Sequence, residues 1–100
     1  MARLDVHPMP GQREGYVLDI QAERLSHLAT RIVVPLLPED SAPKPIATLN
    51  PVYEIRGRRH VLVPQGIASI AGRVLDSAVA SLVGHDDSIA RALGLLLAGD

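Results

Sequence analysis

The chain contains no cysteine among its 100 residues. Disulfide bonds, a thiol nucleophile and a thiolate metal site are therefore excluded. The absence of cysteine agrees with a reducing compartment, so we expect a cytoplasmic protein.

Aromatic residues are nearly absent as well. Tyr16 and Tyr53 are the only two, and there is no phenylalanine or tryptophan. Proteins that bind single-stranded nucleic acids stack the bases on aromatic rings, so the composition argues against that class. A hydrophobic core must then be built from leucine, valine, isoleucine and alanine.

The chain lacks both an excess of one charge and a long apolar run. The formal net charge is -1, and 47% of the residues are hydrophobic, which excludes a disordered acidic or basic tail. The most apolar stretch, residues 92–99, is far shorter than the ~20 residues of a transmembrane helix. The first ten residues show no apolar signal-peptide core. The length fits a single domain over residues 1–100.

Short strands separated by proline and glycine are expected in the first two-thirds of the chain. Pro35 cannot donate to a strand ladder, so it marks an edge or a bulge. Residues 56–59 form a polar turn between two β-rich runs, which is typical of a hairpin. The strands, all within about residues 1–63, are predicted at residues 3–7, 16–21, 30–37, 52–55 and 60–63.

The last third changes to helical periodicity. Apolar residues recur at three- and four-residue spacing and predict an amphipathic helix over about residues 84–98. Asp86 and Asp87 fall in its first turn, where negative charge suits the helix dipole, and Gly99 fits its C-terminal end. The face expected to pack on the strands consists of Ile89, Ala92, Leu93, Leu96 and Leu97.

No catalytic or metal-binding constellation is evident. His7, His27, His60 and His85 are scattered, with no i, i+4 pair and no cysteine partner. We expect them to be surface or capping residues. We therefore predict no catalytic residue, no metal and no cofactor.

One basic patch is present at the predicted hairpin, comprising Arg56, Arg58, Arg59 and His60. Three arginines at a hairpin tip could contact phosphates. A solvated turn that discourages edge pairing is the simpler interpretation, and the net charge favours it.

Several short motifs, taken in order, resemble the CcdB family of type II toxin–antitoxin toxins. The resemblance runs from about Tyr16 to the C-terminal end, and residues 3–7 match the expected first strand. Each motif is weak alone, whereas the ordered set is fairly specific. The matching stretches are Tyr16–Gln21, Arg31–Leu36, Leu49–Ile55, Ile67–Ile70 and Ser88–Leu93, followed by a leucine-rich segment and Gly99.

This resemblance implies a mostly β fold: a five-stranded, SH3-like antiparallel barrel with a small extra sheet and one C-terminal α-helix. The MazF/Kid ribonuclease toxins share that fold. CcdB-like toxins are homodimers that bind the A subunit of DNA gyrase and trap its cleaved DNA complex. They are not enzymes. Their antitoxin is partly disordered and folds on binding, and only the toxin–antitoxin complex represses the operon.

The resemblance also implies a gyrase-binding surface. Toxic members carry Trp-Gly-Ile at the positions of Ala98, Gly99 and Asp100, so a methyl group replaces the aromatic anchor here and an acid replaces the last apolar residue. The family places an asparagine and a phenylalanine where this chain has Gly94 and Leu97. The implied surface consists of Arg24, Leu25, Gly94, Leu97, Ala98, Gly99 and Asp100.

Three functions stay open at this point. The first is a gyrase-directed toxin with a rewired surface. The second is a CcdB-fold protein with another target or lost toxicity, which mainly binds an antitoxin. The third is a ribonuclease toxin that uses Arg31, Arg56, Arg58 or Arg59 against RNA phosphates.

We also expect two kinds of protein contact. A homodimer should form with the helix end and residues 67–72 near its two-fold axis. A CcdA-like antitoxin should bring an acidic segment to the loops of residues 8–15 and 38–45, because surface recognition is usually placed on loops.

Overall fold

The computed structural model describes residues 1–100, which form seven short strands and one α-helix. Short 3₁₀ turns connect several of these elements. The elements are β1 (Asp5–Pro8), β2 (Tyr16–Asp19), β3 (Thr30–Pro38), β4 (Val52–Ile55), β5 (Arg58–Leu62), β6 (Ala68–Ala71), β7 (Ala80–Ser81) and α1 (Asp86–Ala98).

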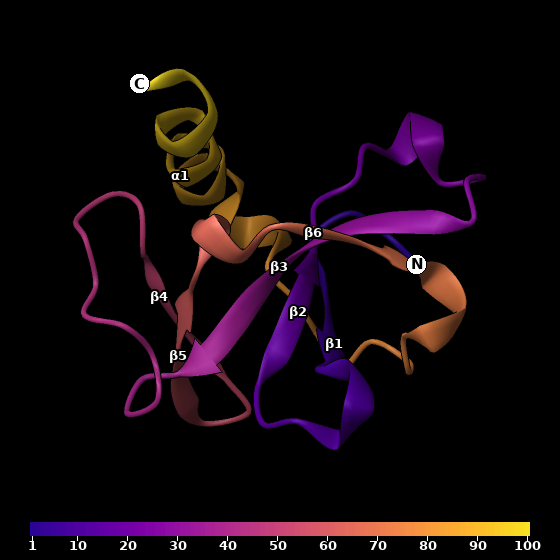
Figure 1. The fold of residues 1–100 in the computed structure, drawn as a ribbon, viewed down its shortest axis with the longest axis horizontal. Coiled ribbons are helices and arrows are strands. Elements are labelled where there is room, and N and C mark those ends of the chain that lie inside the picture. The colour runs from indigo at the N-terminus through magenta and orange to yellow at the C-terminus, as the bar shows by residue number, and fades with distance from the viewer.

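The strands wrap into a nearly closed antiparallel barrel in the order β4-β5-β3-β2-β1-β7, while β6 lies off this path and pairs with β3 (Figure 1). α1 stands at one end of the barrel, and the β1–β2 loop and the β4–β5 turn lie at the other end. The predicted fold class is confirmed. Two short strands, β6 and β7, lie beyond residue 63, outside the range in which strands are expected.

β3 is the central strand, and it changes partner along its length. Its first part, Thr30–Val33, pairs with β6, and its last part, Leu36–Pro38, pairs with β5. Pro35 lies at the changeover, where its carbonyl accepts from the Val63 amide at 2.9 Å. The prediction of an edge or bulge at Pro35 is therefore wrong. A proline is tolerated here because the missing N–H falls between two partner strands.

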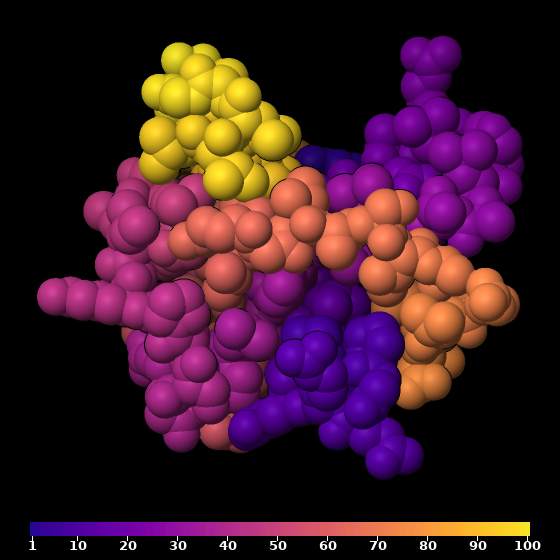
Figure 2. Space-filling model, viewed as in Figure 1, coloured from indigo at the N-terminus to yellow at the C-terminus, as the bar shows by residue number.

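A second buried layer lies on the outer face of the barrel, where alternate residues of β1–β3 point away from the interior. Arg31 donates from Nε and Nη2 to one carboxylate oxygen of Asp19, at 2.9 and 2.6 Å, and both side chains are fully buried. Gly72 packs against the Arg31 stem. β6, which leads directly into Gly72, crosses the front of the molecule in Figure 2.

His7 belongs to the same layer. It is 1% exposed, and its Nδ1–H donates to the Asp76 carbonyl at 2.8 Å. The prediction of a surface histidine is wrong for His7 because the chain that follows β6 folds back over β1.

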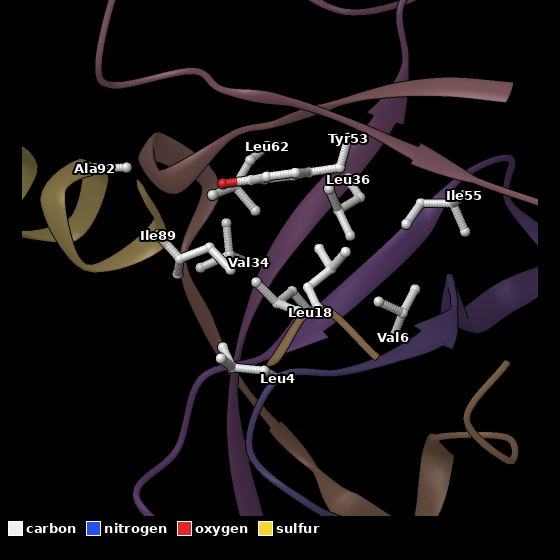
Figure 3. Close-up of a cluster of buried hydrophobic side chains, with 11 residues drawn as sticks. Leu4, Val6, Leu18, Val34, Leu36, Tyr53, Ile55, Leu62, Ile89 and Ala92 are labelled. Atoms are coloured by element: carbon white, nitrogen blue, oxygen red, sulfur yellow. The ribbon is translucent and has the colours of Figure 1, made fainter. Parts of the chain in front are cut away.

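The barrel interior is filled by side chains from β1–β5 and from α1 (Figure 3). Tyr53 is the single aromatic ring among them. Its hydroxyl donates to Ser88 Oγ, which donates to the His85 carbonyl, so the core is hydrogen-bonded to the base of α1. The cluster consists of Leu4, Val6, Leu18, Val34, Leu36, Tyr53, Ile55, Leu62, Leu82, Ile89 and Ala92.

The helix boundaries agree with the prediction to within two residues. A 3₁₀ turn, Val83–His85, leads into α1, and Gly99 ends it with φ 77°. That left-handed conformation lets the Gly99 amide donate to the Leu95 carbonyl at 3.1 Å. The structure contains no helix with the length and apolar character of a membrane span.

The β4–β5 hairpin turns more tightly than predicted. Arg56 and Gly57 are its only two turn residues, with φ 53° and 81°. Two left-handed residues match the twist of the flanking strands. Arg58 and Arg59 therefore lie in β5, and the prediction of a four-residue turn is wrong.

Candidate functional site

The end of α1 is exposed and partly apolar. Leu97 is 71% exposed, so its predicted place on the packed face is wrong. The helix is buried on the barrel at Ile89 and Ala92, and its last turns extend beyond the strands (Figure 1). Helical periodicity predicts which side chains share a face, but not where the barrel beneath that face ends. We call Gly94, Leu97, Ala98, Gly99 and Asp100 the helix-end surface.

Arg24 and Leu25 lie in the 3₁₀ turn Glu23–Leu25. Both are exposed, and 46% of Leu25 is accessible. The side chain of Gln21 holds this turn, because its amide donates to the Leu25 carbonyl at 2.8 Å and accepts from the Ile32 amide at 3.0 Å. Gln21 is a positioning residue that the sequence analysis missed, since nothing in the sequence marks its contacts.

The two parts of the predicted surface share one side of the molecule but do not meet. In Figure 2, α1 and the turn that carries Arg24 project as separate masses, with a hollow between them. Within one chain the structure therefore places the turn Glu23–Leu25 and the end of α1 apart, on either flank of that hollow.

The opposite end, which we call the mouth, carries the arginine patch. Arg58 pairs with Glu14 at 2.8 Å and with Asp40 at 3.3 Å, and Arg59 pairs with Glu39 at 3.0 Å. The hydrogen bond that Arg58 donates to the Glu14 carboxylate raises the pKa of Arg58 above its ordinary value. Arg56 forms no ion pair. The patch is a solvated set of ion pairs at the rim, which agrees with its interpretation as a solvated turn rather than a phosphate site.

His60 is the exception within this patch. It is 3% exposed, and its Nδ1–H donates to the Arg58 carbonyl at 2.8 Å. Its ring centroid lies 4.9 Å from that of Tyr16 in a T-shaped arrangement. The prediction of a surface role is wrong for His60, because it alternates inward along β5. His27 and His85 are exposed as predicted.

A cavity of about 390 Å³ opens at the mouth. It joins the β1–β2 loop to the β4–β5 hairpin and to the segment before β7. We call it the mouth pocket. It is lined by Pro8, Glu14, Gly15, Tyr16, Ile55, Arg56, Arg58, His60 and Val79. The sequence analysis singled out only its arginines and His60, because the other residues come together only in the folded barrel.

Arg31 is not available to an external phosphate. It is 1% exposed and fully engaged with Asp19, on the outer layer rather than at the mouth. The sequence-based suggestion that Arg31 contacts RNA is therefore wrong. The structure holds no group of three or more histidine or carboxylate side chains able to bind a metal.

The family model described as "CcdB protein" matches residues 3–99. A search of curated protein sequences finds no significant match.

Among solved structures, the chain resembles an endoribonuclease in complex with its cognate antitoxin from a mycobacterial species, with a TM-score of 0.77 and 14% identity. That alignment covers 97% of this chain and 94% of the other. It also resembles the Mycobacterium tuberculosis toxin MazF-mt6, with a TM-score of 0.68 and 18% identity over 90% of this chain and 92% of that one. At these identities the likeness shows the fold alone.

Proposed function

Because the chain belongs to the CcdB family of type II toxins, we propose that it inhibits DNA gyrase by binding the A subunit, without chemistry of its own. The observation that carries this proposal is the exposed end of α1. A toxin that acts on another enzyme needs a rigid recognition surface, and the Gly99 cap fixes this one to a helix that is anchored in the core.

The apolar side chains at this end supply the binding energy in the proposal. Leu97 is 71% exposed, and Leu25 and Leu28 on the neighbouring loop are exposed by 46% and 44%. Covering a large aliphatic side chain contributes about 1.5–3 kcal/mol. Leu25 and Leu97 belong to the gyrase-binding surface that the family resemblance implies, and Leu28 would extend it.

The same surface predicts weak binding to a gyrase that is sensitive to tryptophan-bearing toxins. Ala98 offers only a methyl group at the anchor position, and Asp100 adds a negative charge. Loss of a tryptophan hot spot costs about 2–4 kcal/mol, or roughly 30- to 1000-fold in affinity. The cognate gyrase would then differ at the surface that meets residues 97–100.

An antitoxin and a second copy of the chain complete the proposal. The mycobacterial relative is described in complex with its cognate antitoxin, and we extend that partnership to this chain. Homodimerisation would place helix ends and 67–72 segments around one two-fold axis, repeating the surface. Sedimentation of the chain as a monomer at high concentration would contradict this part.

A CcdB-fold protein that binds its antitoxin but not gyrase is the alternative. The ribonuclease function has less support, because Arg31 is buried and Arg58 and Arg59 are paired with carboxylates. A gyrase toxin should cause gyrase-dependent DNA cleavage, and a ribonuclease should cleave RNA without gyrase. A protein that only binds its antitoxin should do neither.

The test measures binding of the chain to purified gyrase A subunit, together with trapping of cleaved DNA. We expect Leu97→Asp to weaken binding at least tenfold, because a charge replaces a leucine that the complex would bury. Val83→Asp is the matched control, since Val83 is 68% exposed at the other end of the helical segment and should not matter. Equal binding by both variants, or RNA cleavage without gyrase, would overturn the proposal.

A further inference from the structure

The mouth pocket combines an apolar lining with positive charge. Pro8, Tyr16 and Val79 contribute apolar surface, while Arg56 and Arg58 bring guanidinium groups. Its volume of about 390 Å³ is within the range of sites that hold a small ligand or a few side chains. A ligand for this pocket needs an apolar part and an anionic group close together.

One arginine is uncommitted and the other is only loosely committed. Arg56 forms no ion pair. Arg58 binds Glu14 at 2.8 Å, but both side chains are more than half exposed. Exposed ion pairs contribute little to stability. An incoming oxyanion can therefore replace Glu14 on Arg58 with little loss of stability.

The groups that carry these arginines are held rigidly. The buried His60 donates to the Arg58 carbonyl, and its ring packs against that of Tyr16 in a T-shaped arrangement. Gly15 runs so close to β3 that an added Cβ would lie 2.7 Å from the Leu36 carbonyl oxygen, and its φ is 103°. The β1–β2 loop and the hairpin thus keep a fixed spacing on either side of the pocket.

The nature of the anion follows from the surrounding charges. Glu14 and Asp40 pair with Arg58, and Glu39 pairs with Arg59, so Arg56 is the one unpaired arginine of the rim and the mouth has little excess positive charge to attract a polyanion. A single carboxylate beside an apolar side chain fits this balance better than a chain of phosphates.

We propose that the mouth pocket binds an acidic peptide, with one carboxylate taken by Arg58 and Arg56 in exchange for Glu14, and an adjacent apolar side chain against Tyr16 and Val79. The inference rests on the proposed function to the extent that an antitoxin would supply the peptide. Glu14 and the carboxylate of such a segment would then compete for Arg58.

The probe is the peptide acetyl-Leu-Asp-Leu-amide, titrated into the intact protein and followed by NMR shifts of backbone amides. We expect shifts at Gly15, Tyr16 and Arg58, and much smaller shifts with acetyl-Leu-Asn-Leu-amide. Arg58→Gln should weaken binding about tenfold or more, because a charge-assisted hydrogen bond is lost. Glu14→Gln should strengthen binding about two- to fivefold, because it removes the competing carboxylate.

Glu39→Gln is the matched control, since Glu39 pairs with Arg59 outside the pocket. It should leave peptide binding unchanged. A merely structural role of the pair would make Glu14→Gln neutral or harmful to binding, so the gain distinguishes the two explanations. Equal binding of the asparagine peptide, or no gain in Glu14→Gln, would overturn the inference.

A short oligoribonucleotide provides the last arm. If it displaces the peptide from the pocket, the site is a phosphate site for RNA and the inference is wrong. The assay contains no gyrase, so its failure does not affect the proposed gyrase binding, and failure of gyrase binding does not affect this result.

Discussion

The two ends of the barrel present surfaces of different chemistry. At the α1 end, Leu97 is 71% exposed and Leu25 is 46% exposed. At the mouth, Arg58 and Arg59 are exposed but already meet carboxylates. Protein interfaces gain most of their affinity from buried apolar anchors, whereas charge pairs mainly set specificity and association rate. The two ends would therefore bind a protein for different reasons.

The support beneath the two ends differs as well. Next to the loop that carries Leu25, Asp19 binds the fully buried Arg31 and also accepts from the Gln21 amide at 3.0 Å. Gln21 in turn holds the Leu25 carbonyl. At the mouth, the buried His60 holds the Arg58 carbonyl, and the ion pairs between the loops are all exposed. A buried ion pair therefore supports one end, whereas the ion pairs of the other end are replaceable.

The largest expected effect is on stability, when the buried Arg31–Asp19 pair is broken. Arg31→Met leaves Asp19 buried without a counter-charge and should lower the free energy of unfolding by about 3–5 kcal/mol. Arg58→Met removes only exposed pairs and should leave the denaturation midpoint almost unchanged. Chemical denaturation of both variants measures the difference. Similar losses in the two variants would show that the ends are supported alike.

The next effect sharpens the α1 end as a recognition surface. Ala98→Trp combined with Asp100→Ile should raise affinity for the gyrase A subunit by roughly 30-fold or more, since it restores an aromatic anchor and removes a charge. Ala90→Trp places the same ring on another exposed position of α1 and serves as the control.

Binding and cleavage-trapping assays decide this prediction. Absence of a gain in the double variant would show that the helix end is not the gyrase site. Strong trapping by the unmodified chain would move the contact toward Arg24 and Leu25.

The smallest effect concerns Tyr53, which links the core to the base of α1. Burial raises the pKa of Tyr53 above 10.0, and the Ser88 hydrogen bond and the charge of Arg91 oppose that rise. The unfolded chain therefore ionises first, so this contribution to stability is complete below about pH 10 and decreases above it.

Tyr53→Phe tests this pH dependence. The variant should be about 1 kcal/mol less stable at pH 8, because it lacks the hydrogen bond to Ser88. Its stability deficit should shrink above pH 10, because the protein with tyrosine loses stability as the tyrosine ionises and the phenylalanine variant does not. Urea denaturation across pH 8–11 measures both quantities. A constant deficit would mean that Tyr53 does not titrate with folding.

Local features of the fold followed closely from the residues. The alternation of Tyr16, Leu18 and Ile20 predicted β2, and the β-branched run predicted β3. Gly99 ended the helix because a left-handed residue is needed there and glycine adopts it without strain. Each of these signals depends on a few neighbouring residues, so the sequence carries them directly.

Features that depend on distant segments were not predictable in this way. His7 and His60 appeared as surface residues, yet the return of residues 72–76 and the closure of the barrel bury them. The mouth pocket joins Glu14, Arg58 and Val79, which are far apart in the chain. No local pattern encodes such contacts, because they arise only when separate loops meet.

The sequence by itself determined the strand and helix periods, the aliphatic core without tryptophan or phenylalanine, and a helix that ends at Gly99. Only the tertiary structure decided that Leu97 is exposed while Ile89 and Ala92 are buried, and that Arg31 is an internal counter-ion while Arg58 is external. The physical reason is the same in each case. Side-chain chemistry and spacing are properties of the chain, whereas burial and pairing depend on which distant segment lies across each residue.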